Sequence, residues 1–396
     1  MISTRKYLGS DIKTILAEKG LDGDARPWRD PLEATSGQDV QRALACPAGS
    51  YSLERLSAFV SPAAEDYLEE MAQLARQLTV QRFGRTIRLY APLYLSNFCV
   101  NSCRYCGFNR EHEVKRTRLT IEQALTEADI IAAEGFRDIL LVSSEDREIV
   151  SVEYLTELAK KLRSKFSSIS IEVYQMNVAE YAKLFEAGID GVTVYQETYD
   201  RQAYAYYHPA GPKSDYDNRL DVPERIAAAG MREVGLGVLL GLADWRLETL
   251  ALAEHAAYLV KRYWRSHVSF SFPRLRPAYK ANGLQSKHLL SDKNLVQMMM
   301  ALRLCFADAG LVLSTRERAG LRDRLIKLGI TKMSAGSKTS PGGYSEQTDT
   351  VDSRPAGSLR QFEIDDSRTP AEVAAMIRAQ GAEPVWKYWD SAFSED

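Results

Sequence analysis

The chain is poor in cysteine, with five in 396 residues, and its charges of the two signs are nearly balanced. A chain of this length can bury a full core without disulfide bonds. Its 51 Lys and Arg against 53 Asp and Glu leave a net charge of −2, which provides no basic face for nucleic acid. It has no run of about 18 apolar residues that would predict a membrane span, and no apolar signal peptide. We therefore expect a cytoplasmic chain that binds neither nucleic acid nor membranes.

Three of the five cysteines stand close together, as Cys99, Cys103 and Cys106. Clustered cysteines in the reducing cytoplasm bind metal more often than they form disulfides. Because an iron–sulfur cluster is normally held by four thiolates, three of them predict a metal centre with one vacant position. The other two cysteines, Cys46 and Cys305, are flanked by apolar residues and are expected to be buried. The sequence therefore lacks the cysteines for a second cluster.

Two other classes of protein use closely spaced cysteines. A structural zinc site needs a fourth ligand, and His112, six residues beyond Cys106, is the only nearby candidate. This spacing matches no common zinc-finger pattern. An iron–sulfur electron carrier is the other alternative, but carriers generally close their clusters fully. The vacant position is more typical of a chemically active site.

From Thr86 onward, short apolar runs alternate with amphipathic stretches at intervals of about 25–35 residues. This pattern predicts an α/β fold, a parallel (β/α)8 TIM-type barrel, with an open three-quarter barrel or a doubly wound sheet as the alternative. The predicted strands are Ile87–Ala91, Asp138–Ser143, Ser168–Tyr174, Gly191–Gln196, Glu233–Leu240, Val268–Phe272, Leu311–Thr315 and Lys332–Ala335. The predicted helices are Pro62–Leu78, Ile121–Gly135, Val152–Lys165, Val178–Ala187, Val222–Ala229, Leu247–Tyr263, Asp292–Ala309, Arg318–Lys327 and Pro370–Gln380.

The predicted elements divide the chain into three parts. Residues 1–84 form a helical N-terminal extension, residues 85–340 the barrel, and residues 341–396 a C-terminal loop and helix that pack on the barrel. The cysteine triplet follows the first barrel strand, at the carboxyl end of the barrel where active sites lie. Polar or small residues end other strands, namely Glu145 after the second, Gln196 and Glu197 after the fourth, and Gly237 in the fifth.

The spacing Cys99-x-x-x-Cys103-x-x-Cys106, with the aromatic Tyr105 before the last cysteine, resembles the signature of the radical S-adenosylmethionine superfamily. The resemblance implies a 4Fe–4S cluster on the three thiolates and S-adenosylmethionine on the fourth iron. Glu145 matches the acid that receives the cofactor's amino group in that superfamily, although Ser143 and Ser144 replace the usual glycines. We expect three further polar contacts to the cofactor, from Tyr105, Gln196 and Glu197. Gly237 is expected to let a flat ring approach the backbone closely.

A closer resemblance, to the 2-iminoacetate synthase family of thiamine biosynthesis, extends from about Ser61 to Trp389. It rests on the segments Ala91–Asn97, Val194–Tyr199, Ser271–Pro277, Leu313–Glu317, Pro341–Tyr344 and Pro384–Lys387. The resemblance implies a one-cluster barrel that cleaves the Cα–Cβ bond of L-tyrosine to 2-iminoacetate and 4-methylphenol. It also implies a reductant such as flavodoxin, and transfer of the imine to a thiazole synthase subunit.

Such a reaction requires a cation for the substrate carboxylate, for which a guanidinium is best suited. Arg316, after the seventh strand, is our first candidate, with Arg274 and Arg276 in reserve. The resemblance also implies that the radical attacks the amino group of the substrate, which must therefore lose a proton. The candidates for a nearby acceptor are Tyr94, Ser334 and Ser337.

Two relatives with the same triplet remain alternatives. A tryptophan lyase would share the barrel and the cysteines. The tyrosine lyase of hydrogenase maturation carries a second cluster on C-terminal cysteines, whereas this chain has only Cys305 after Cys106.

Overall fold

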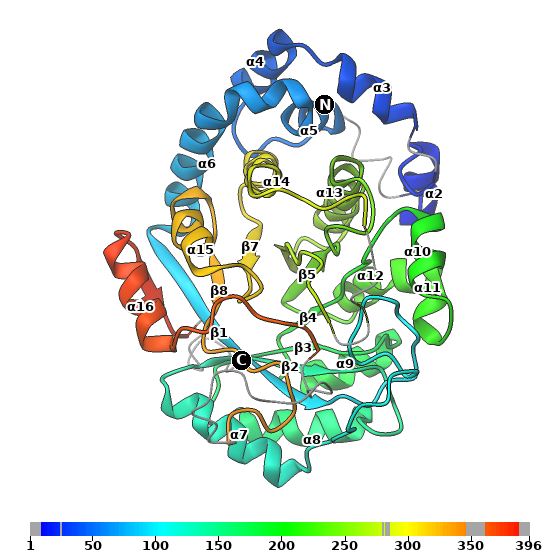
Figure 1. Cartoon of the computed structure of the whole chain (residues 1–396), viewed down its shortest axis with the longest axis vertical. Coiled ribbons are helices and arrows are strands. Elements are labelled where there is room, and N and C mark those ends of the chain that lie inside the picture. The colour runs from blue at the N-terminus through cyan, green and yellow to red at the C-terminus, as the bar shows by residue number, and fades with distance from the viewer. Residues whose placement is uncertain (1–8, 24–25, 279–280, 282–285, 346–360, 388–396) are drawn as a thin grey trace.

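Eight parallel strands close into a barrel in the computed structural model, which describes residues 9–23, 26–278, 281, 286–345 and 361–387 (Figure 1). Each strand pairs with the next one along the chain, and β8 and β2 both pair with β1. The barrel strands are β1 Thr86–Ser96, β2 Asp138–Ser143, β3 Ser168–Glu172, β4 Gly191–Thr193, β5 Glu233–Gly237, β6 His267–Ser271, β7 Gly310–Leu313 and β8 Lys332–Ser334. The predicted (β/α)8 barrel is confirmed, and the open sheet weighed as an alternative is excluded by the closing pairs.

Helices follow the strands and surround the barrel. They are α7 Ile121–Ala133, α8 Val152–Leu162, α9 Val178–Glu186, α12 Val222–Ala228, α13 Trp245–Arg262, α14 Asp292–Cys305 and α15 Ala319–Leu325. Helix α7 begins at Thr120, which forms a reciprocal capping box with Gln123. Gly188 follows α9 with a φ of 104°, the left-handed conformation that commonly ends a helix. These local signals explain why most predicted helix boundaries differ little from the observed ones.

Strand β1 differs most from its predicted length, and β4 and β5 each end three residues before their predicted ends. β1 continues past Ala91 to Ser96, because its second half is buried and pairs with β2. β4 ends at Thr193 rather than at Gln196, and a little farther on Glu197 has a φ of 68°. Side chains disfavour positive φ, so such a residue marks a turn out of extended structure. The chain thus leaves β4 early, at the mouth of the barrel.

The residues before the barrel form a helical layer that arches over one end of the molecule (Figure 1). Its elements are α2 Ile12–Glu18, α3 Arg26–Ala34, α4 Gly37–Ala45, α5 Leu53–Val60, the 3-10 helix η1 Pro62–Tyr67 and α6 Leu68–Phe83. The predicted single helix Pro62–Leu78 is therefore two elements, since a 3-10 turn precedes α6. Helix α5 packs against α13 and α14. Cys305 is buried as predicted, whereas the prediction for Cys46 is wrong, because it caps the exposed end of α4.

The described C-terminal residues return to the barrel after β8. Helix α16, Pro370–Ala379, begins with a capping box between Thr369 and Glu372, and β9, Glu383–Val385, pairs in parallel with the first residues of β1. Strand β9 was not predicted, because three residues are too few for a periodic pattern. Residues 346–360 and 388–396 of the predicted C-terminal part, and 1–8 and 24–25 of the N-terminal one, lie outside the described residues. The division of the chain at residues 84 and 340 stays a prediction.

A buried ion pair joins the C-terminal segment to the barrel. The guanidinium of Arg322 in α15 contacts the carboxylate of Asp366 and the carbonyl of Ser334, and both charged side chains are almost completely buried. Arg368 also donates to Asp366, at 2.7 and 2.9 Å. Although burial raises the pKa of Asp366, these hydrogen bonds and the charge of Arg322 outweigh it and hold the pKa below its usual value.

We expect Asp366→Ala to destabilise the protein strongly, because the guanidinium of Arg322 would stay buried without its counter-charge. Breaking a buried pair in this way costs about 3–5 kcal/mol. An anaerobic thermal melt of the cluster-loaded protein should show the loss as a midpoint about 5–15 °C lower. Asp308→Ala is the matched control, since Asp308 is exposed and its pair with Arg82 is 3.5 Å long. Equal melting midpoints for the two variants would contradict this role of the pair.

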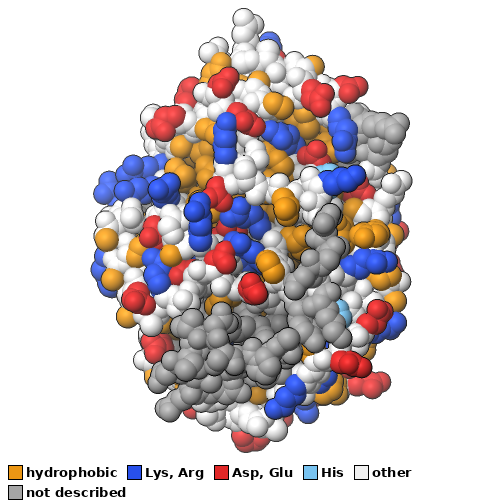
Figure 2. Space-filling view, in the orientation of Figure 1, with side chains coloured by type: hydrophobic (Ala, Val, Ile, Leu, Met, Phe, Trp, Pro, Cys, Tyr) orange, Lys and Arg blue, Asp and Glu red, His pale blue; other side chains and the backbone are white. Residues whose placement is uncertain are grey.

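The outer surface carries charges of both signs. Figure 2 shows Asp, Glu, Lys and Arg side chains interspersed over the face seen in Figure 1. Among the described residues, no helix combines the length and the apolar character that crossing a membrane requires.

Candidate active site

A cavity with two lobes opens at the carboxyl end of the barrel strands. We call the part lined by the three cysteines the cluster lobe and the part lined by Tyr90, Ser334 and Ser337 the barrel lobe. Two charged side chains, Glu172 at the end of β3 and Arg316 after β7, line both lobes. The two lobes therefore adjoin each other at these side chains.

The cysteine loop is held in place by hydrogen bonds to its own backbone. Asn97, just after β1, accepts from the backbone N–H of Thr117 at 2.6 Å through its side-chain oxygen and donates to the carbonyl of Lys115 at 2.9 Å. The guanidinium of Arg116 donates to the carbonyls of Asn97 at 2.6 Å, Phe108 at 2.9 Å and Asn109 at 2.7 Å. One arginine thus fixes both ends of the loop that carries the cysteines.

The three clustered thiols line one lobe of the cavity. Cys99, Cys103 and Cys106 line the same lobe, yet in the described part of the chain no three His, Cys, Asp or Glu side chains are arranged to hold one metal ion. Burial raises the pKa of Cys106 to about 11 and also raises the pKa of the other two thiols. Metal-bound cysteines are deprotonated, so these thiols need a bound cation to be thiolates. His112, the zinc candidate, lies with a ring nitrogen 3.3 Å from the carbonyl oxygen of Gly107.

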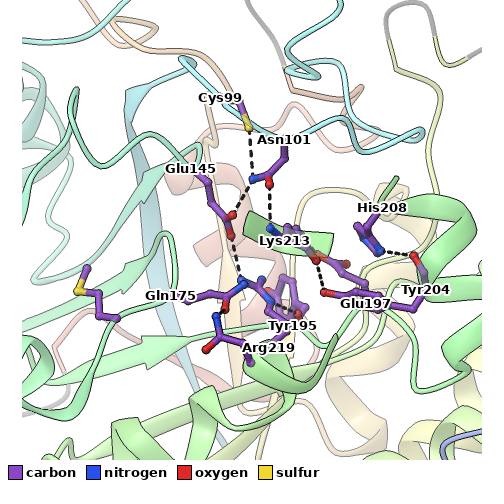
Figure 3. A network of polar contacts seen from close by, with 12 residues as sticks. Cys99, Asn101, Glu145, Gln175, Tyr195, Glu197, Tyr204, His208, Lys213 and Arg219 are labelled. Carbon is purple, nitrogen blue, oxygen red and sulfur yellow. Dashed lines mark hydrogen bonds and ion pairs between the residues drawn. The ribbon is translucent and has the colours of Figure 1, made fainter. Parts of the chain in front are cut away.

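A polar network leads from the cysteine loop to Glu145 (Figure 3). The side-chain nitrogen of Asn101 donates to Glu145 at 2.6 Å and lies 3.8 Å from the sulfur of Cys99. The side-chain oxygen of Asn101 accepts from the backbone N–H of Lys213 at 2.9 Å. Glu145 also forms an ion pair of 3.1 Å with Arg219. Glu145 therefore lies beside the cysteines, held from two sides.

A second ion pair lines the cluster lobe. The ammonium of Lys213 lies 2.6 Å from the carboxylate of Glu197, and both side chains are mostly buried. Burial raises the pKa of Glu197, but the charges of Lys213 and Arg219 outweigh it and lower the pKa below its usual value. Among the described residues other than glycine, Glu197 alone has a positive φ. Strain of this kind is frequent at functional sites.

Lys213 and Arg219 belong to an insertion that the sequence analysis missed. Between β4 and α12 the chain forms α10 Arg201–Tyr207, the 3-10 helix η2 Pro212–Ser214 and α11 Tyr216–Leu220. These helices are too short to give a clear apolar period. The backbone N–H of Lys213 donates to Asn101, and the guanidinium of Arg219 pairs with Glu145, and each partner lies more than 70 positions away along the chain. The insertion thus builds one wall of the cavity.

Tyr105 lines the cluster lobe and is fixed by a neutral histidine. Its hydroxyl lies 2.9 Å from Nε2 of His208, and Nδ1 of His208 lies 2.8 Å from the carbonyl oxygen of Tyr204. Because a carbonyl can only accept, Nδ1 carries the proton and Nε2 accepts from Tyr105. Burial lowers the pKa of His208 to about 3, so the ring stays neutral.

Gln196 and Gly237, which were both predicted to contact the cofactor, do not line the cavity. Tyr195 and Glu197 on either side of Gln196 line it, whereas Gln196 itself is buried outside the lining. Gly237 faces a neighbouring strand, where a Cβ atom would stand 2.6 Å from the ring of Tyr195. Its lack of a side chain makes room for that tyrosine. The hypothesis that Gly237 admits a flat ring stays a prediction.

The structure separates the three arginine candidates. Arg274 is paired with Asp292 and Glu317, and Arg276 with Asp365 and Glu317. Arg316 has no carboxylate partner among the described residues.

Instead the guanidinium of Arg316 lies over the ring of Phe362, 3.4 Å from its centre. Of the three candidate arginines, Arg316 is therefore the one whose guanidinium is available to bind the carboxylate of a ligand.

The three predicted acceptors occupy different parts of the cavity. Tyr94 lines the cluster lobe, and its hydroxyl donates to the side-chain oxygen of Gln361 at 2.9 Å. Ser334 lines the barrel lobe and accepts from the backbone N–H of Thr315 at 3.1 Å. The hydroxyl of Ser337, in the same lobe, is buried and has no hydrogen-bond partner in the described structure.

Comparison with known proteins places the chain among enzymes. The family model of the Radical SAM superfamily matches residues 93–253, and that of the Biotin and Thiamin Synthesis associated domain matches residues 271–383. The 2-iminoacetate synthase of Escherichia coli (strain K12) is 44% identical over 361 residues, which are 91% of this chain and 93% of that protein.

Two solved structures share the fold. The crystal structure of HydG, a maturase of the FeFe-hydrogenase, is 31% identical with a TM-score of 0.85 and covers 95% of this chain and 81% of its own. That of methylornithine synthase is 21% identical with a TM-score of 0.69, covering 89% of this chain and 98% of its own.

Proposed function

The chain belongs to the 2-iminoacetate synthase family of radical S-adenosylmethionine enzymes, and from this premise we propose how its cavity acts on L-tyrosine. The reaction is cleavage of the Cα–Cβ bond to 2-iminoacetate and 4-methylphenol, which makes the protein a carbon–carbon lyase. The family uses a 4Fe–4S cluster and S-adenosylmethionine, which when bound supply the 5′-deoxyadenosyl radical. The protein contributes binding, orientation and exclusion of water.

One observation carries this proposal: an arginine without a carboxylate partner lies in the same cavity as three clustered thiols. Arg316 is suited to the carboxylate of an amino acid, because a guanidinium offers paired donors. Cys99, Cys103 and Cys106 would hold the cluster, beside the carboxylate of Glu145. Glu197, Lys213 and Tyr105 would form the rest of the cofactor wall. Tyr94, Ser334 and Ser337 supply further polar contacts to the substrate.

The test is one anaerobic incubation of reconstituted protein with S-adenosylmethionine, a reductant, and L-tyrosine and L-tryptophan side by side. We expect 4-methylphenol and 2-iminoacetate in amounts that match 5′-deoxyadenosine. Formation of 3-methylindole would favour the tryptophan lyase instead. A protein that holds zinc on the triplet, or no iron, would exclude both readings. The two-cluster lyase of hydrogenase maturation is disfavoured, because the sequence has only Cys305 after Cys106.

We further propose that the product passes to a thiazole synthase subunit, and that a flavodoxin-type protein in the cytoplasm supplies electrons. An imine of this kind hydrolyses in water, which favours direct transfer. The match to a domain associated with thiamin synthesis supports the pathway. Co-purification tests the first of these partners. We expect the thiazole synthase subunit to purify together with this protein, and its absence from the purified protein would contradict the transfer.

A further inference from the structure

The charges that line the cavity form pairs, with one exception of each sign. Three carboxylates line it, those of Glu145, Glu172 and Glu197. Glu145 is paired with Arg219, and Glu197 with Lys213. No Lys, Arg or His in the described part of the chain forms an ion pair with Glu172. Of the cations that line the cavity, Arg316 is likewise the one without a carboxylate partner.

The two unpaired charges face each other across the barrel. Glu172 is the last residue of β3, and Arg316 follows β7. In the strand order β2-β3-β4-β5-β6-β7-β8-β1, four steps separate β3 from β7, so the two strands are opposite each other in a ring of eight. Both side chains line both lobes. An α-amino acid carries one charge of each sign on adjacent groups, so this arrangement is complementary to it.

We propose that Glu172 binds the α-ammonium group of the substrate and accepts a proton from it, while Arg316 holds the carboxylate. This proposal rests on the proposed function, because it assumes an amino acid in the cavity. In the step, an N–H bond of the ammonium breaks and an O–H bond forms on Glu172. The electron pair of the N–H bond stays on nitrogen, so a neutral amine and a carboxylic acid result, with no change of oxidation state.

The surroundings of Glu172 favour this transfer. Burial raises the pKa of Glu172, and Glu197 adds to the rise, while Arg316, Lys213 and a hydrogen bond with Tyr195 oppose it. A buried ammonium is likewise easier to deprotonate than one in water. In a cavity of low polarity, a neutral carboxylic acid beside a neutral amine is favoured over a carboxylate beside an ammonium. The titratable and charged groups around the carboxylate are Tyr90, Tyr94, Tyr195, Glu197, Lys213 and Arg316.

The other acceptors are less suited to the proton. Burial raises the pKa of Tyr94 far above its usual value, so its phenol stays protonated. Its hydroxyl already donates to Gln361. The hydroxyls of Ser334 and Ser337 hold a second proton only weakly, because serine is not basic near neutral pH. Of the three carboxylates that line the cavity, Glu172 is the one that forms no ion pair with a cation among the described residues.

The first experiment measures turnover of L-tyrosine by Glu172→Gln between about pH 6.5 and pH 9. Loss of a general base lowers kcat by about 10²- to 10⁴-fold. The residual rate should rise about tenfold per pH unit, because the variant depends on substrate amine that is already neutral. The wild-type rate should change much less over the same range. A Glu172→Gln variant with the wild-type kcat and pH profile would overturn the proposal.

Two control variants separate this role from a structural one. Tyr195→Phe removes the phenol hydroxyl that lowers the pKa of Glu172 but keeps the carboxylate of Glu172, so its pH profile should keep the wild-type shape. If Tyr195→Phe reproduced the rising profile, Glu172 would act only by positioning Tyr195. Glu157→Gln makes the same substitution on the exposed face of α8 and should behave as wild type. If Glu172→Gln fails to load the cluster, Glu172→Asp decides: a reduced rate with a flat profile supports the proposal, and a rising profile overturns it.

Binding provides a second readout that does not depend on turnover. Without reductant, the wild type should bind L-tyrosine about 10-fold or more tightly than its desamino analogue, 3-(4-hydroxyphenyl)propanoate. In Glu172→Gln this preference should vanish, and an unchanged preference would contradict contact with the ammonium. If the wild type makes no 4-methylphenol, the proposed function fails, and the same comparison with L-tryptophan and 3-(indol-3-yl)propanoate still tests Glu172.

Discussion

A Cys103→Ser variant is expected to hold no 4Fe–4S cluster above background and to form no 5′-deoxyadenosine. Cys103 is the most buried of the three clustered cysteines, and burial raises the pKa of its thiol. A serine hydroxyl at this position would have to lose a far less acidic proton in the same environment, so it would be a poor ligand for iron. Two thiolates would then remain for a cluster that this family holds with three. Iron content and the electron paramagnetic resonance of the reduced protein measure the outcome.

Cys305→Ser provides the matched control for this prediction. Cys305 is also buried, and burial raises its pKa to about 12, but it lies on α14, far from the cysteine loop in sequence. The variant should keep its cluster, although it introduces a hydroxyl into the core. Loss of iron from Cys305→Ser but not from Cys103→Ser would show that the triplet is not the metal site.

Arg316→Ala should lower kcat/KM for L-tyrosine by roughly 30- to 3000-fold, because truncating one partner of a desolvated charge pair costs a few kcal/mol. The guanidinium lies in the cavity without a carboxylate of its own, so nothing else in the described structure replaces it for the substrate. Arg316→Lys should recover only part of the loss, because an ammonium cannot donate two parallel hydrogen bonds. Slow formation of 5′-deoxyadenosine without tyrosine should be unchanged, since the cysteine loop is untouched.

Arg318→Ala is the matched control for Arg316→Ala. Arg318 stands two residues farther along the same loop, is largely exposed and pairs with Asp292. Exposed pairs contribute at most about 1 kcal/mol, so turnover of L-tyrosine should stay close to that of the wild type. Equal losses in both variants would indicate that the loop as a whole, and not the guanidinium of Arg316, supports the reaction.

The sequence predicted those parts of the fold that depend on local order. Strand β2 has its predicted bounds, because its apolar run lies between the helix stop at Gly135 and the polar Ser144. The short helices α10 and α11 and strand β9 were missed, because segments of three to seven residues carry too few positions for a period. Tertiary contacts, rather than local preferences, determine these elements.

Predicting the site from the sequence had a similar limit. Cys99, Glu145 and Arg316 line the cavity because strand ends of one barrel meet at one face. The sequence placed Arg316 first but kept Arg274 and Arg276 in reserve, since the pairing of the latter two depends on carboxylates brought close by folding. Glu172 was missed for the same reason. A single glutamate at a strand end is common. Glu172 differs from Glu145 and Glu197 because it forms no ion pair with a cation among the described residues, and the sequence does not show this.

The position of Gln361 and Phe362 has a consequence for how the protein is made. Gln361 accepts a hydrogen bond from Tyr94 and lies 4.0 Å from the sulfur of Cys106, and Phe362 lies under Arg316. These two residues are synthesised about 250 residues after the cysteine loop that they cover. A growing chain therefore displays its three thiols before the last wall of the cavity exists.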